Sequence, residues 1–276
     1  MTARVTTVVV TRNRRDRLLA SLAPERGRAG GPVVVVDNGS DDGTAAAVRR
    51  EHPEVSVISL SRNYGAVARN VGVWAAETPY VAFADDDSWW AGDALEHAAD
   101  ELDGHSDWGL VAGSVLVGES RRPDPVTRAM QASRLPEVGN RGARLAAGFV
   151  CCGAVARVKA LRETGGFDPI VFFAGEEERV TLDLLATGWR VVHVPWVVAH
   201  HYPDTQPKPG RTALILRNAF LTAVMRRPWR VVVGRGIEAL LNAPVGAFGR
   251  ALPRLRAAWE SRQPVPSYVE DYLRLA

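Results

Sequence analysis

The sequence predicts an α/β protein with a single, mostly parallel, Rossmann-like central sheet flanked by helices. Residues 5–11 and 33–36 are apolar runs rich in β-branched residues, and a segment with helical spacing of Leu18, Leu19 and Leu22 separates them. Continuous apolar runs are typical of parallel strands that helices cover on both faces. Because this order of strand, helix and strand repeats along the chain, the α/β class is favoured.

The elements that follow continue the repeat. Asp41 or Asp42 is placed to cap a helix over 43–52, and a helix over 65–77 ends before Pro79. Further strands are predicted over 55–60, 80–84 and 108–117, and a further helix over 91–104.

The second half of the chain has a less regular pattern. Residues 118–147 are polar and irregular, and we expect them to form a lid that orders when a donor binds. A short helix, a loop that feeds a helix at Glu176, and a strand ending in two histidines come next. Beyond Pro203, prolines interrupt a series of helices rich in Arg, Leu and Trp. We therefore expect one domain over 1–203, with halves 1–117 and 118–203, and a helical extension over 204–276.

The composition excludes several classes of protein. The chain has 276 residues, of which 46% are hydrophobic and 24% charged, so it can bury a large core. Lysine occurs only at Lys159 and Lys208, and no basic stripe with interleaved aromatic residues predicts a nucleic-acid partner. The adjacent Cys151 and Cys152 indicate a reduced, cytoplasmic protein. We expect neither a signal peptide nor a membrane-spanning helix, because no long apolar segment occurs.

Three familiar motifs are missing from the chain. It has no G-x-G-x-x-G after the first strand, no G-x-x-x-x-G-K-[ST] and no G-x-S-x-G. Dinucleotide redox, P-loop and nucleophile-elbow chemistry therefore lack their key element. A phosphate-bearing substrate would then have to be held by a metal ion.

Four polar clusters follow predicted strands, at 11–13, 37–42, 85–87 and 200–201. The carboxyl ends of parallel strands meet at one edge of a sheet, so we expect these clusters to line one cleft. The three adjacent aspartates repel one another unless a cation lies among them. Carboxylates and imidazoles together suit Mg²⁺ or Mn²⁺. Asp-rich turns also cap helices and bind water, which is the alternative for residues 37–42.

A second acidic cluster, Glu176, Glu177 and Glu178, opens a predicted helix. Negative charge is favourable at a helix N-terminus, which is a sufficient structural explanation. However, the residues before the cluster are largely apolar, and a carboxylate against an apolar surface has a raised pKa and is suited to act as a general base. The residues alone leave both interpretations open.

Six segments, taken in order, resemble the family 2 glycosyltransferases of GT-A fold. They are VVVTRNR, VVVVDNGSDDGT, SRNYGAVARNVGVWAAETPYVAFADDDSWW, GGFDP, GEEERVTLDLLATGW and VPWVVAHHY. The resemblance covers roughly residues 5–202, and the joint order is far more specific than any one segment. It implies an inverting, metal-dependent enzyme that moves a sugar from a nucleotide-sugar donor to an acceptor hydroxyl, with residues 1–203 as the GT-A catalytic domain.

The resemblance implies a donor site at the carboxyl end of the sheet. The Asp matching Asp37 accepts a hydrogen bond from uracil or thymine, which favours UDP or dTDP. Asp87 matches the metal ligand of a DXD motif, and His201 or His200 matches a late histidine on the metal side, which implies Mg²⁺ or Mn²⁺ as cofactor. The residues implied to bind the nucleotide-sugar are Thr11, Arg12, Asn13, Asp37, Asn63, Arg69, Asp85 and Asp86.

The resemblance also implies acceptor-side and catalytic residues. Gly166, Phe167 and Trp90 are assigned to the acceptor side. The family's ED pair corresponds to Glu176 and Glu177, and its second member is the catalytic base. Because this chain has Glu at the second position and a further Glu after it, the identity of the base among the three stays open, with Glu177 preferred.

Two other functions remain open. A sugar-phosphate nucleotidyltransferase has a related architecture but needs a Gly-rich loop after the first strand, and TRNRRDR has no glycine. A non-catalytic carbohydrate-binding or scaffold protein would have no need of the acidic clusters, which are present. The implied acceptor is a carbohydrate, a lipid or a small molecule. The extension 204–276 packs on the domain, forms a homodimer, or lies on the inner face of the membrane.

Overall fold

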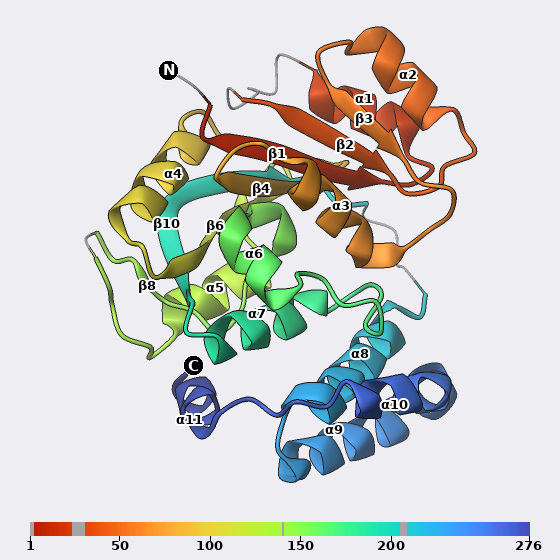
Figure 1. The fold of residues 1–276 in the computed structure, drawn as a ribbon, viewed down its shortest axis with the longest axis vertical. Coiled ribbons are helices and arrows are strands. Elements are labelled where there is room, and N and C mark those ends of the chain that lie inside the picture. Colours follow the sequence, from red (N-terminus) through yellow and green to blue (C-terminus); the bar gives the residue numbers. More distant parts are fainter. Residues whose placement is uncertain (1–2, 24–30, 140, 205–208) are drawn as a thin grey trace.

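A curled central sheet flanked by helices dominates the molecule, and a further group of helices lies at its C-terminal end (Figure 1). This computed structural model describes residues 3–23, 31–139, 141–204 and 209–276. The predicted α/β class and the helical nature of the C-terminal extension are both confirmed.

The first half of the sheet is parallel. Strand β1 (Val5–Thr11) lies between β2 (Val33–Asp37) and β4 (Tyr80–Asp85), and β3 (Ser56–Ser59) borders β2. All three pairings are parallel, as the apolar runs predict. Each of these strands therefore ends at the same edge of the sheet.

The second half of the sheet is mixed. Strand β9 (Ala154–Arg157) runs antiparallel between β4 and β6 (Trp108–Val117), and β10 (Arg190–His201) returns parallel to β6. Strand β5 (Ser88–Trp90) pairs antiparallel with the end of β10. The described strands run in the order β3-β2-β1-β4-β9-β6-β10-β5, and β7 (Arg122–Pro123) and β8 (Arg144–Leu145) pair with β6 and β10. The sheet thus contains short antiparallel strands that the sequence pattern does not predict.

Strand β10 contains an irregular stretch in its pairing with β6. His193 is in register with Ala112, and the next pair is Val198 with Ser114. Pro195 lies inside this stretch and has no N–H to donate, so a regular ladder cannot pass through it. Residues after the stretch carry the chain back to the edge where β1 and β4 end, through the pairing of His201 with Ser88.

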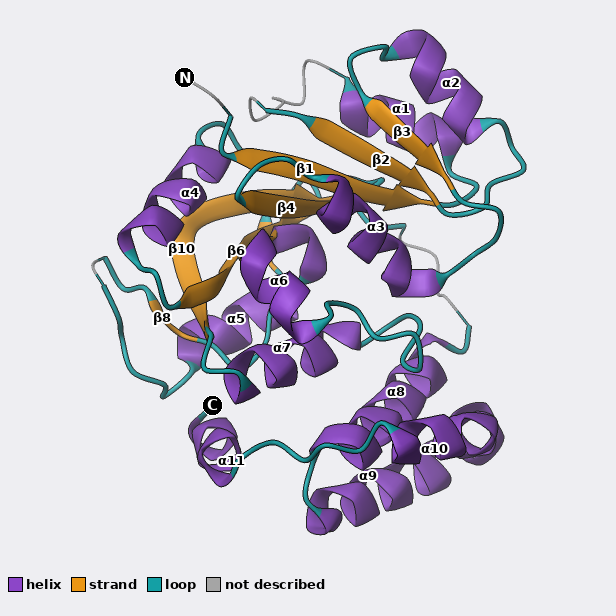
Figure 2. Cartoon of the chain, in the orientation of Figure 1, coloured by secondary structure: helices purple, strands orange, loops and turns teal. Residues whose placement is uncertain are grey.

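Helices cover both faces of the sheet (Figure 2). On one face, Val8 and Phe83 pack against apolar residues of α3, α6 and α7, and on the other face Tyr80 and Val5 pack against α4. Helix α1 and helix α2 cover β1 and β2. The bounds are α1 Arg15–Leu22, α2 Thr44–Glu51, α3 Ala68–Ala75, α4 Ala94–Gly104, α5 Pro125–Ala132, α6 Val158–Thr164 and α7 Glu176–Ala186.

One expectation about the second half is wrong. The segment 118–147 was expected to be irregular, but it contains helix α5 with buried Thr127 and Met130. Asp124 caps this helix, since its carboxylate accepts a hydrogen bond from the N–H of Val126 at 2.8 Å, and Pro125 follows at the first helical position. An Asp-Pro start signal was therefore present in the sequence.

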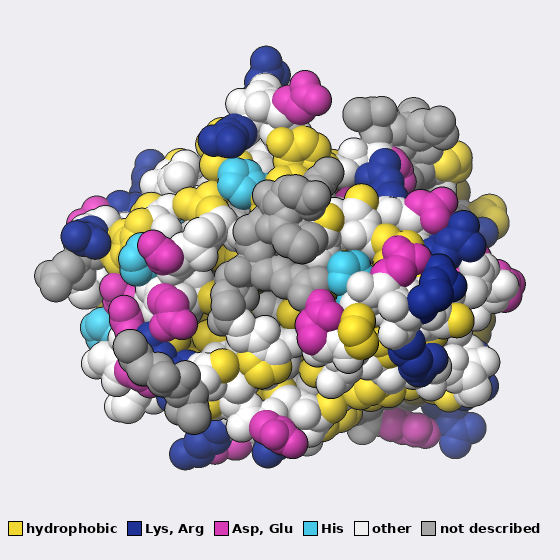
Figure 3. All heavy atoms as spheres, turned by 90° about the horizontal axis from the view of Figure 1, so that it is seen from above, with side chains coloured by type: hydrophobic (Ala, Val, Ile, Leu, Met, Phe, Trp, Pro, Cys, Tyr) yellow, Lys and Arg dark blue, Asp and Glu magenta, His cyan; other side chains and the backbone are white. Residues whose placement is uncertain are grey.

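The C-terminal extension consists of α8 (Arg211–Arg226), α9 (Trp229–Asn242), α10 (Arg250–Glu260) and α11 (Ser267–Leu275). Helix α8 has a buried face that includes Leu221 and Met225, and Val269 of α11 packs near Leu182 of α7. Among the described residues, none of the helices combines the length and the apolar composition that crossing a bilayer demands. At the opposite end of the molecule, acidic and basic side chains are interspersed (Figure 3).

Candidate active site

The carboxyl ends of β1, β2 and β4 bring several predicted donor residues together. Thr11 is in register with Asp37, and Val10 is in register with Asp85. The buried Thr11 hydroxyl donates a hydrogen bond to Asp86 Oδ2 at 3.0 Å. Polar clusters distant in sequence therefore meet at one edge of the sheet, as expected from parallel strand ends.

The loops after β1 and β2 are tied to each other. The Asn13 side chain accepts a hydrogen bond from the N–H of Asp41 at 2.9 Å, and the Asn13 N–H donates to Ser40 Oγ at 2.9 Å. The buried Asp37 carboxylate accepts from the Ser40 N–H at 3.0 Å. Arg12 lies exposed beside this network. Residues 11–13 and 37–41 thus form one continuous surface.

Asn63 lies beside the end of β2, whereas Asp42 lies at the start of α2. Asn63 Oδ1 accepts hydrogen bonds from Asn38 Nδ2 at 3.1 Å and from the N–H of Gly65 at 2.8 Å, which joins the turn before α3 to the end of β2. Asp42 accepts from the N–H of Thr44 at 3.0 Å, at the start of α2. Gly43 occupies the N-cap position of α2, so the predicted cap residue is wrong by one position, although the Asp42 carboxylate does serve the first turn of the helix.

Two arginines neutralise the second and third aspartates. Arg14 Nε lies 2.7 Å from Asp86 Oδ1, and Arg14 Nη2 lies 3.1 Å from Asp87 Oδ2. Arg17 Nη1 lies 3.5 Å from Asp87 Oδ2, and both arginines also pair with Asp204 after β10. The motifs do not predict these arginines, although their i, i+3 spacing directly after the first strand places them on one side of a helix start.

The two neutralised aspartates differ in acidity. Burial raises the pKa of Asp86 to about 6, and the charge of Asp87 adds to this effect, although Arg14 opposes it. Burial also disfavours ionisation of Asp87, but the hydrogen bond with His201 and the charges of Arg14 and Arg17 outweigh it and lower the pKa of Asp87. Asp87 is thus held as an anion, as a metal ligand must be.

Only one histidine of the pair faces the aspartates. His201 Nε2 lies 3.2 Å from Asp87 Oδ1, and this contact raises the pKa of His201 against the effect of burial. The ring of His200 instead lies 5.6 Å from the ring of Trp89. Successive side chains of a strand point to opposite faces, so the two histidines cannot both reach Asp87. The assignment of His200 as a metal ligand is therefore wrong, and His201 is the candidate.

A cysteine lies next to this histidine. Ligand atoms of Asp85, Cys152 and His201 all lie within 4.8 Å of one another. His201 Nδ1 is buried and has no hydrogen-bond partner among the described residues. An orphaned imidazole nitrogen beside a carboxylate and a thiol fits a divalent cation. The sequence gives no signal for Cys152, because its approach depends on the packing of the turn before β9.

Arg69 links the aspartates to the glutamates of α7. Arg69 is buried, its Nη1 lies 2.7 Å from Glu176 Oε1, and its Nη2 lies 3.4 Å from Asp85 Oδ1. Glu176 is only 3% exposed, so its charge needs this guanidinium as a partner. The two acidic clusters that the sequence predicts therefore both contact the guanidinium of Arg69.

The three adjacent glutamates have different surroundings, because neighbouring residues of a helix point about 100° apart. Glu176 faces Arg69, whereas Glu178 faces the C-terminal helices and lies 3.6 Å from Arg227. Burial and the neighbouring Glu176 raise the pKa of Glu177 to about 8. Glu177 is half-buried and has no strong cationic partner of its own, which leaves it the best suited of the three to accept a proton.

The loop before α7 is strained, and a residue of α8 holds it by hydrogen bonds. Phe172 and Ala174 have φ angles of 69° and 71°, in the left-handed region that such residues rarely adopt. The fully buried Asn218 of α8 donates hydrogen bonds from Nδ2 to the carbonyl oxygens of Phe173 at 2.6 Å and Ala174 at 2.7 Å. The C-terminal extension thereby fixes the backbone that leads into Glu176.

The turn before α7 has a geometric reason for its paired glycines. Gly166 has φ of +66°, and a Cβ there would lie 2.4 Å from Asn70 Oδ1. That oxygen accepts a hydrogen bond from the N–H of Phe167 at 2.8 Å. Phe167 itself is 1% exposed and its ring packs edge-on against Phe83. The Phe167 side chain is therefore part of the core and does not form an acceptor surface.

Trp90 is also a core residue. It is 3% exposed and packs with apolar residues of α4, such as Leu95. The expectation that the Trp90 side chain contacts an acceptor is therefore wrong. The neighbouring Trp89 is half-buried and its ring stacks on Tyr202 at 4.9 Å, because alternation along β5 turns the two rings to opposite faces.

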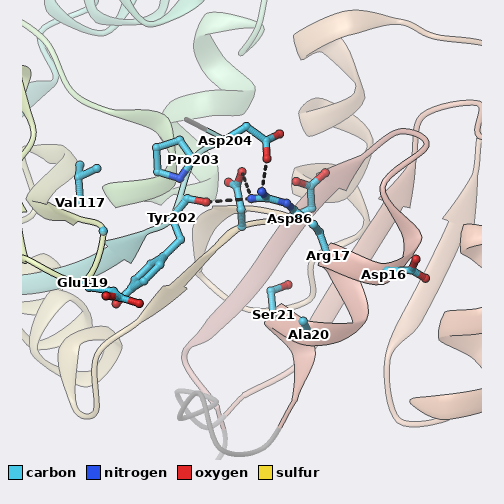
Figure 4. A pocket seen from close by; sticks show the side chains of 12 residues that line it. Asp16, Arg17, Ala20, Ser21, Asp86, Val117, Glu119, Tyr202, Pro203 and Asp204 are labelled. Atoms are coloured by element: carbon cyan, nitrogen blue, oxygen red, sulfur yellow. Dashed lines mark hydrogen bonds and ion pairs between the residues drawn. The ribbon is translucent and has the colours of Figure 1, made fainter. Parts of the chain in front are cut away.

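A cavity of about 670 Å³ opens beside the aspartates (Figure 4). It lies between α1, the end of β6 and the end of β10, and Asp86 and Asp87 form part of its wall. Asp37, Asn63 and Glu177 are not among its lining residues. The cavity and the surface of residues 11–13 are linked through Asp86, which lines the cavity and accepts a hydrogen bond from Thr11.

Comparisons with known proteins identify the family and the fold. A family model described as Glycosyl transferase family 2 matches residues 6–165, which is more than half of the chain. The chain belongs to glycosyl transferase family 2. This family 2 chain is 30% identical over 221 residues to proteins named pre-mycofactocin glycosyltransferase in two strains of Mycobacterium tuberculosis. The matches cover 73% of this chain but 43% of each relative, so the chain spans less than half their length.

Solved glycosyltransferase structures have the same fold as this family 2 chain. Staphylococcus aureus TarS 1–349 in complex with UDP-GlcNAc superposes with a TM-score of 0.61 at 18% identity, covering 91% of this chain and 72% of that one. The mannosyltransferase PcManGT from Pyrobaculum calidifontis, in complex with GDP-Man and Mn²⁺, gives a TM-score of 0.58 at 24% identity, covering 95% and 77%. The predicted GT-A fold is thereby confirmed.

Proposed function

We propose that the protein transfers a sugar from a nucleoside-diphosphate sugar to an acceptor hydroxyl, with inversion at the anomeric carbon. The observation that carries this proposal is the double contact of Arg69 with Glu176 and Asp85. It joins the acidic cluster suited to hold a donor to the acidic cluster suited to supply a base. Family membership and the GDP-Man and UDP-GlcNAc complexes of similar folds support the donor class.

The nucleoside would lie on the surface formed by residues 11–13 and 37–41, next to Asn63. One oxygen of Asp37 accepts from Ser40, and a carboxylate can accept further hydrogen bonds. A ring N–H of a pyrimidine is a suitable donor for it, which favours UDP or dTDP. The diphosphate would then reach Asp85 and Asp86 at the edge of the sheet.

The donor set fits a divalent cation. His201 would hold it, either with Asp87, whose Oδ1 lies 3.2 Å from His201 Nε2, or with Asp85 and Cys152, whose ligand atoms lie within 4.8 Å of a ligand atom of His201. When bound, Mg²⁺ or Mn²⁺ would act as a Lewis acid that offsets charge on the leaving diphosphate. Arg14 and Arg17 already lie against Asp86 and Asp87 and would add fixed positive charge at the same place.

The proposed base is Glu177. With its pKa raised to about 8, it binds a proton more strongly than an ordinary carboxylate and so can deprotonate an acceptor hydroxyl. That oxygen attacks the anomeric carbon while the nucleoside diphosphate leaves on the opposite face, and configuration inverts. Arg69 holds the neighbouring Glu176 in an ion pair at 2.7 Å, which leaves Glu177 as the carboxylate of the pair that takes the proton.

Substitution of the glutamates tests the proposal. The purified protein is incubated with Mn²⁺ and a panel of UDP-, dTDP- and GDP-sugars, and released nucleoside diphosphate is measured. We expect Glu177→Gln to lower the rate by about 100-fold or more while the thermal shift caused by nucleoside diphosphate is kept. Glu178→Gln is the matched control and should keep the rate. A wild-type rate in Glu177→Gln would exclude this base, and no response to any donor would exclude the function.

A further inference from the structure

We infer that the outer surface of α9 and α10 docks on an anionic lipid bilayer. This surface is an apolar stripe, which we define by six side chains that are each more than half exposed: Trp229, Val233, Ile237, Leu241, Leu252 and Trp259. The inference concerns a surface away from the proposed active site and does not depend on the proposed reaction.

The stripe is continuous across the two helices. On α9 its members are four residues apart, which places them on one side of the helix, and on α10 Leu252 and Trp259 are seven residues apart. The rings of Trp229 and Trp259 lie 5.7 Å apart and join the two helices. Globular proteins rarely leave such a row of large apolar side chains uncovered.

The charge around the stripe selects an anionic partner. Between residues 209 and 262 the sequence has ten arginines and two glutamates. Arg217 is buried, and Arg226 and Arg227 pair with acidic groups of α7 and α11. Arg230, Arg250 and Arg256 are exposed, and helical spacing places Arg230 and Arg256 within the face that carries the stripe. Arg230 lies 3.8 Å from Glu270 and Arg256 lies 2.9 Å from Glu260, but the ten arginines still outnumber the two glutamates of this segment.

This combination favours a lipid surface over a second copy of the chain. Two copies docked through this face would bring their arginines together, which is unfavourable, whereas anionic headgroups would neutralise them. Arginine and tryptophan both suit the boundary between headgroups and acyl chains, since each combines an apolar body with a polar end. Arg262 lies over the ring of Trp229 at 4.3 Å, which keeps a cation at that boundary.

The helix lengths agree with docking and not with insertion across a bilayer. Helix α9 has 14 residues, and at about 1.5 Å per residue it is shorter than the hydrocarbon core of about 30 Å. A short amphipathic helix with arginines at its edges lies in the plane of the interface. In Figure 1, α9 lies at the outer margin of the molecule, where a flat surface can reach it.

Vesicle flotation tests this inference. The full chain is mixed with vesicles of phosphatidylcholine alone or with about 30% phosphatidylglycerol, and the bound fraction is measured at low salt and at about 0.5 M salt. We expect binding to the anionic vesicles that is at least about tenfold stronger than to neutral ones and that falls with salt. Equal binding to both vesicle types, or none to either, would overturn the inference.

Two sets of variants separate the contributions. Leu241→Ser combined with Leu252→Ser removes apolar area and should lower the bound fraction about tenfold, and Arg250→Glu or Arg256→Glu should lower it about fivefold each. Trp74→Ser, which removes an exposed tryptophan of α3, should leave binding unchanged. Each variant should keep the circular dichroism spectrum and the Tm of the wild type, which shows that it is folded. A dimer in light scattering that the Leu241→Ser, Leu252→Ser pair dissociates would assign the surface to a second copy instead.

Discussion

The edge of the sheet and the C-terminal helices differ in how their side chains are neutralised or covered. At the sheet edge, parallel strands force like charges together, and the structure answers with arginines placed between them, as Arg69 and Arg14 show. In the C-terminal helices, apolar side chains such as Leu241 stay exposed in a segment where arginines outnumber glutamates. A cluster of carboxylates that are already paired with arginines suits a small, charged ligand. An exposed apolar face suits a partner with a large surface.

The largest expected effect is a loss of metal and nucleotide binding on substitution of Asp87. Asp87→Asn removes the anion that Arg14, Arg17 and His201 surround, so we expect Mn²⁺-dependent nucleotide binding to weaken by more than about 100-fold. Isothermal calorimetry with Mn²⁺ and nucleoside diphosphate measures the change. Retained affinity would show that the cation is held elsewhere.

The adjacent histidines sharpen this test, because they are neighbours on one strand but only His201 faces Asp87. His201→Ala should weaken Mn²⁺-dependent binding by about 10- to 100-fold, whereas His200→Ala should leave it within about twofold. The same calorimetric titration serves for both. Equal losses in the two variants would contradict the alternation that separates them.

A smaller effect tests the link between the two regions. Asn218 holds the strained backbone at Phe173 and Ala174, so Asn218→Ala should let Glu177 move and lower kcat by about 10- to 100-fold. The dissociation constant of the nucleotide should not change, since the sheet edge is untouched. Asn242→Ala, in an exposed position of α9, is the control and should keep kcat. A fall in nucleotide affinity that matched the fall in kcat would indicate general loosening instead.

The pH dependence of turnover tests the environment of Glu177. A base must be ionised to act, so kcat/KM should fall about tenfold per pH unit below a midpoint near about 8. Glu177→Gln should retain only residual activity without this limb. A midpoint near the ordinary glutamate value of 4.5 would mean that Glu177 is well hydrated in the working enzyme.

The smallest expected effect is on stability. Because the folded form raises the pKa of Glu177, the protonated group contributes stability that is complete below about pH 4.5 and is lost as the pH rises through about 8. Glutamine does not titrate, so the Tm of Glu177→Gln relative to wild type should rise by a few degrees between pH 5 and pH 9. The exposed Glu77→Gln is the control and should show no such trend.

The sheet edge was largely predictable from sequence. Strand ends are marked where β-branched runs give way to Asp or Asn, and parallel topology then places Thr11, Asp37 and Asp85 side by side. The same topology could not reveal Arg14 as the partner of Asp86, or Cys152 as the neighbour of His201. Those contacts depend on how separate elements pack, which periodicity does not encode.

Aromatic residues were the least predictable part of the site. Trp90 and Phe167 lie in segments predicted to be functional, yet both side chains are turned into the core, whereas Trp89 is only half-buried. In β5 the direction of a ring depends on the strand register, which a one-residue change reverses, and at Phe167 it depends on the turn after α6. The helical extension was predicted as helical, but its exposed stripe could be recognised only once α8 and α11 had been shown to pack inward.

The irregular stretch of β10 has a consequence for how this chain tolerates change. Between His193 and Val198 the strand advances five residues while β6 advances two, so the stretch sets which of the final histidines meets Asp87. Gaining one residue there would bring His200 to the place of His201, whereas losing one would bring Tyr202 there. Because an imidazole stands at both positions, a one-residue insertion would still present one to the aspartates, and the site is buffered against such an insertion in its own supporting strand.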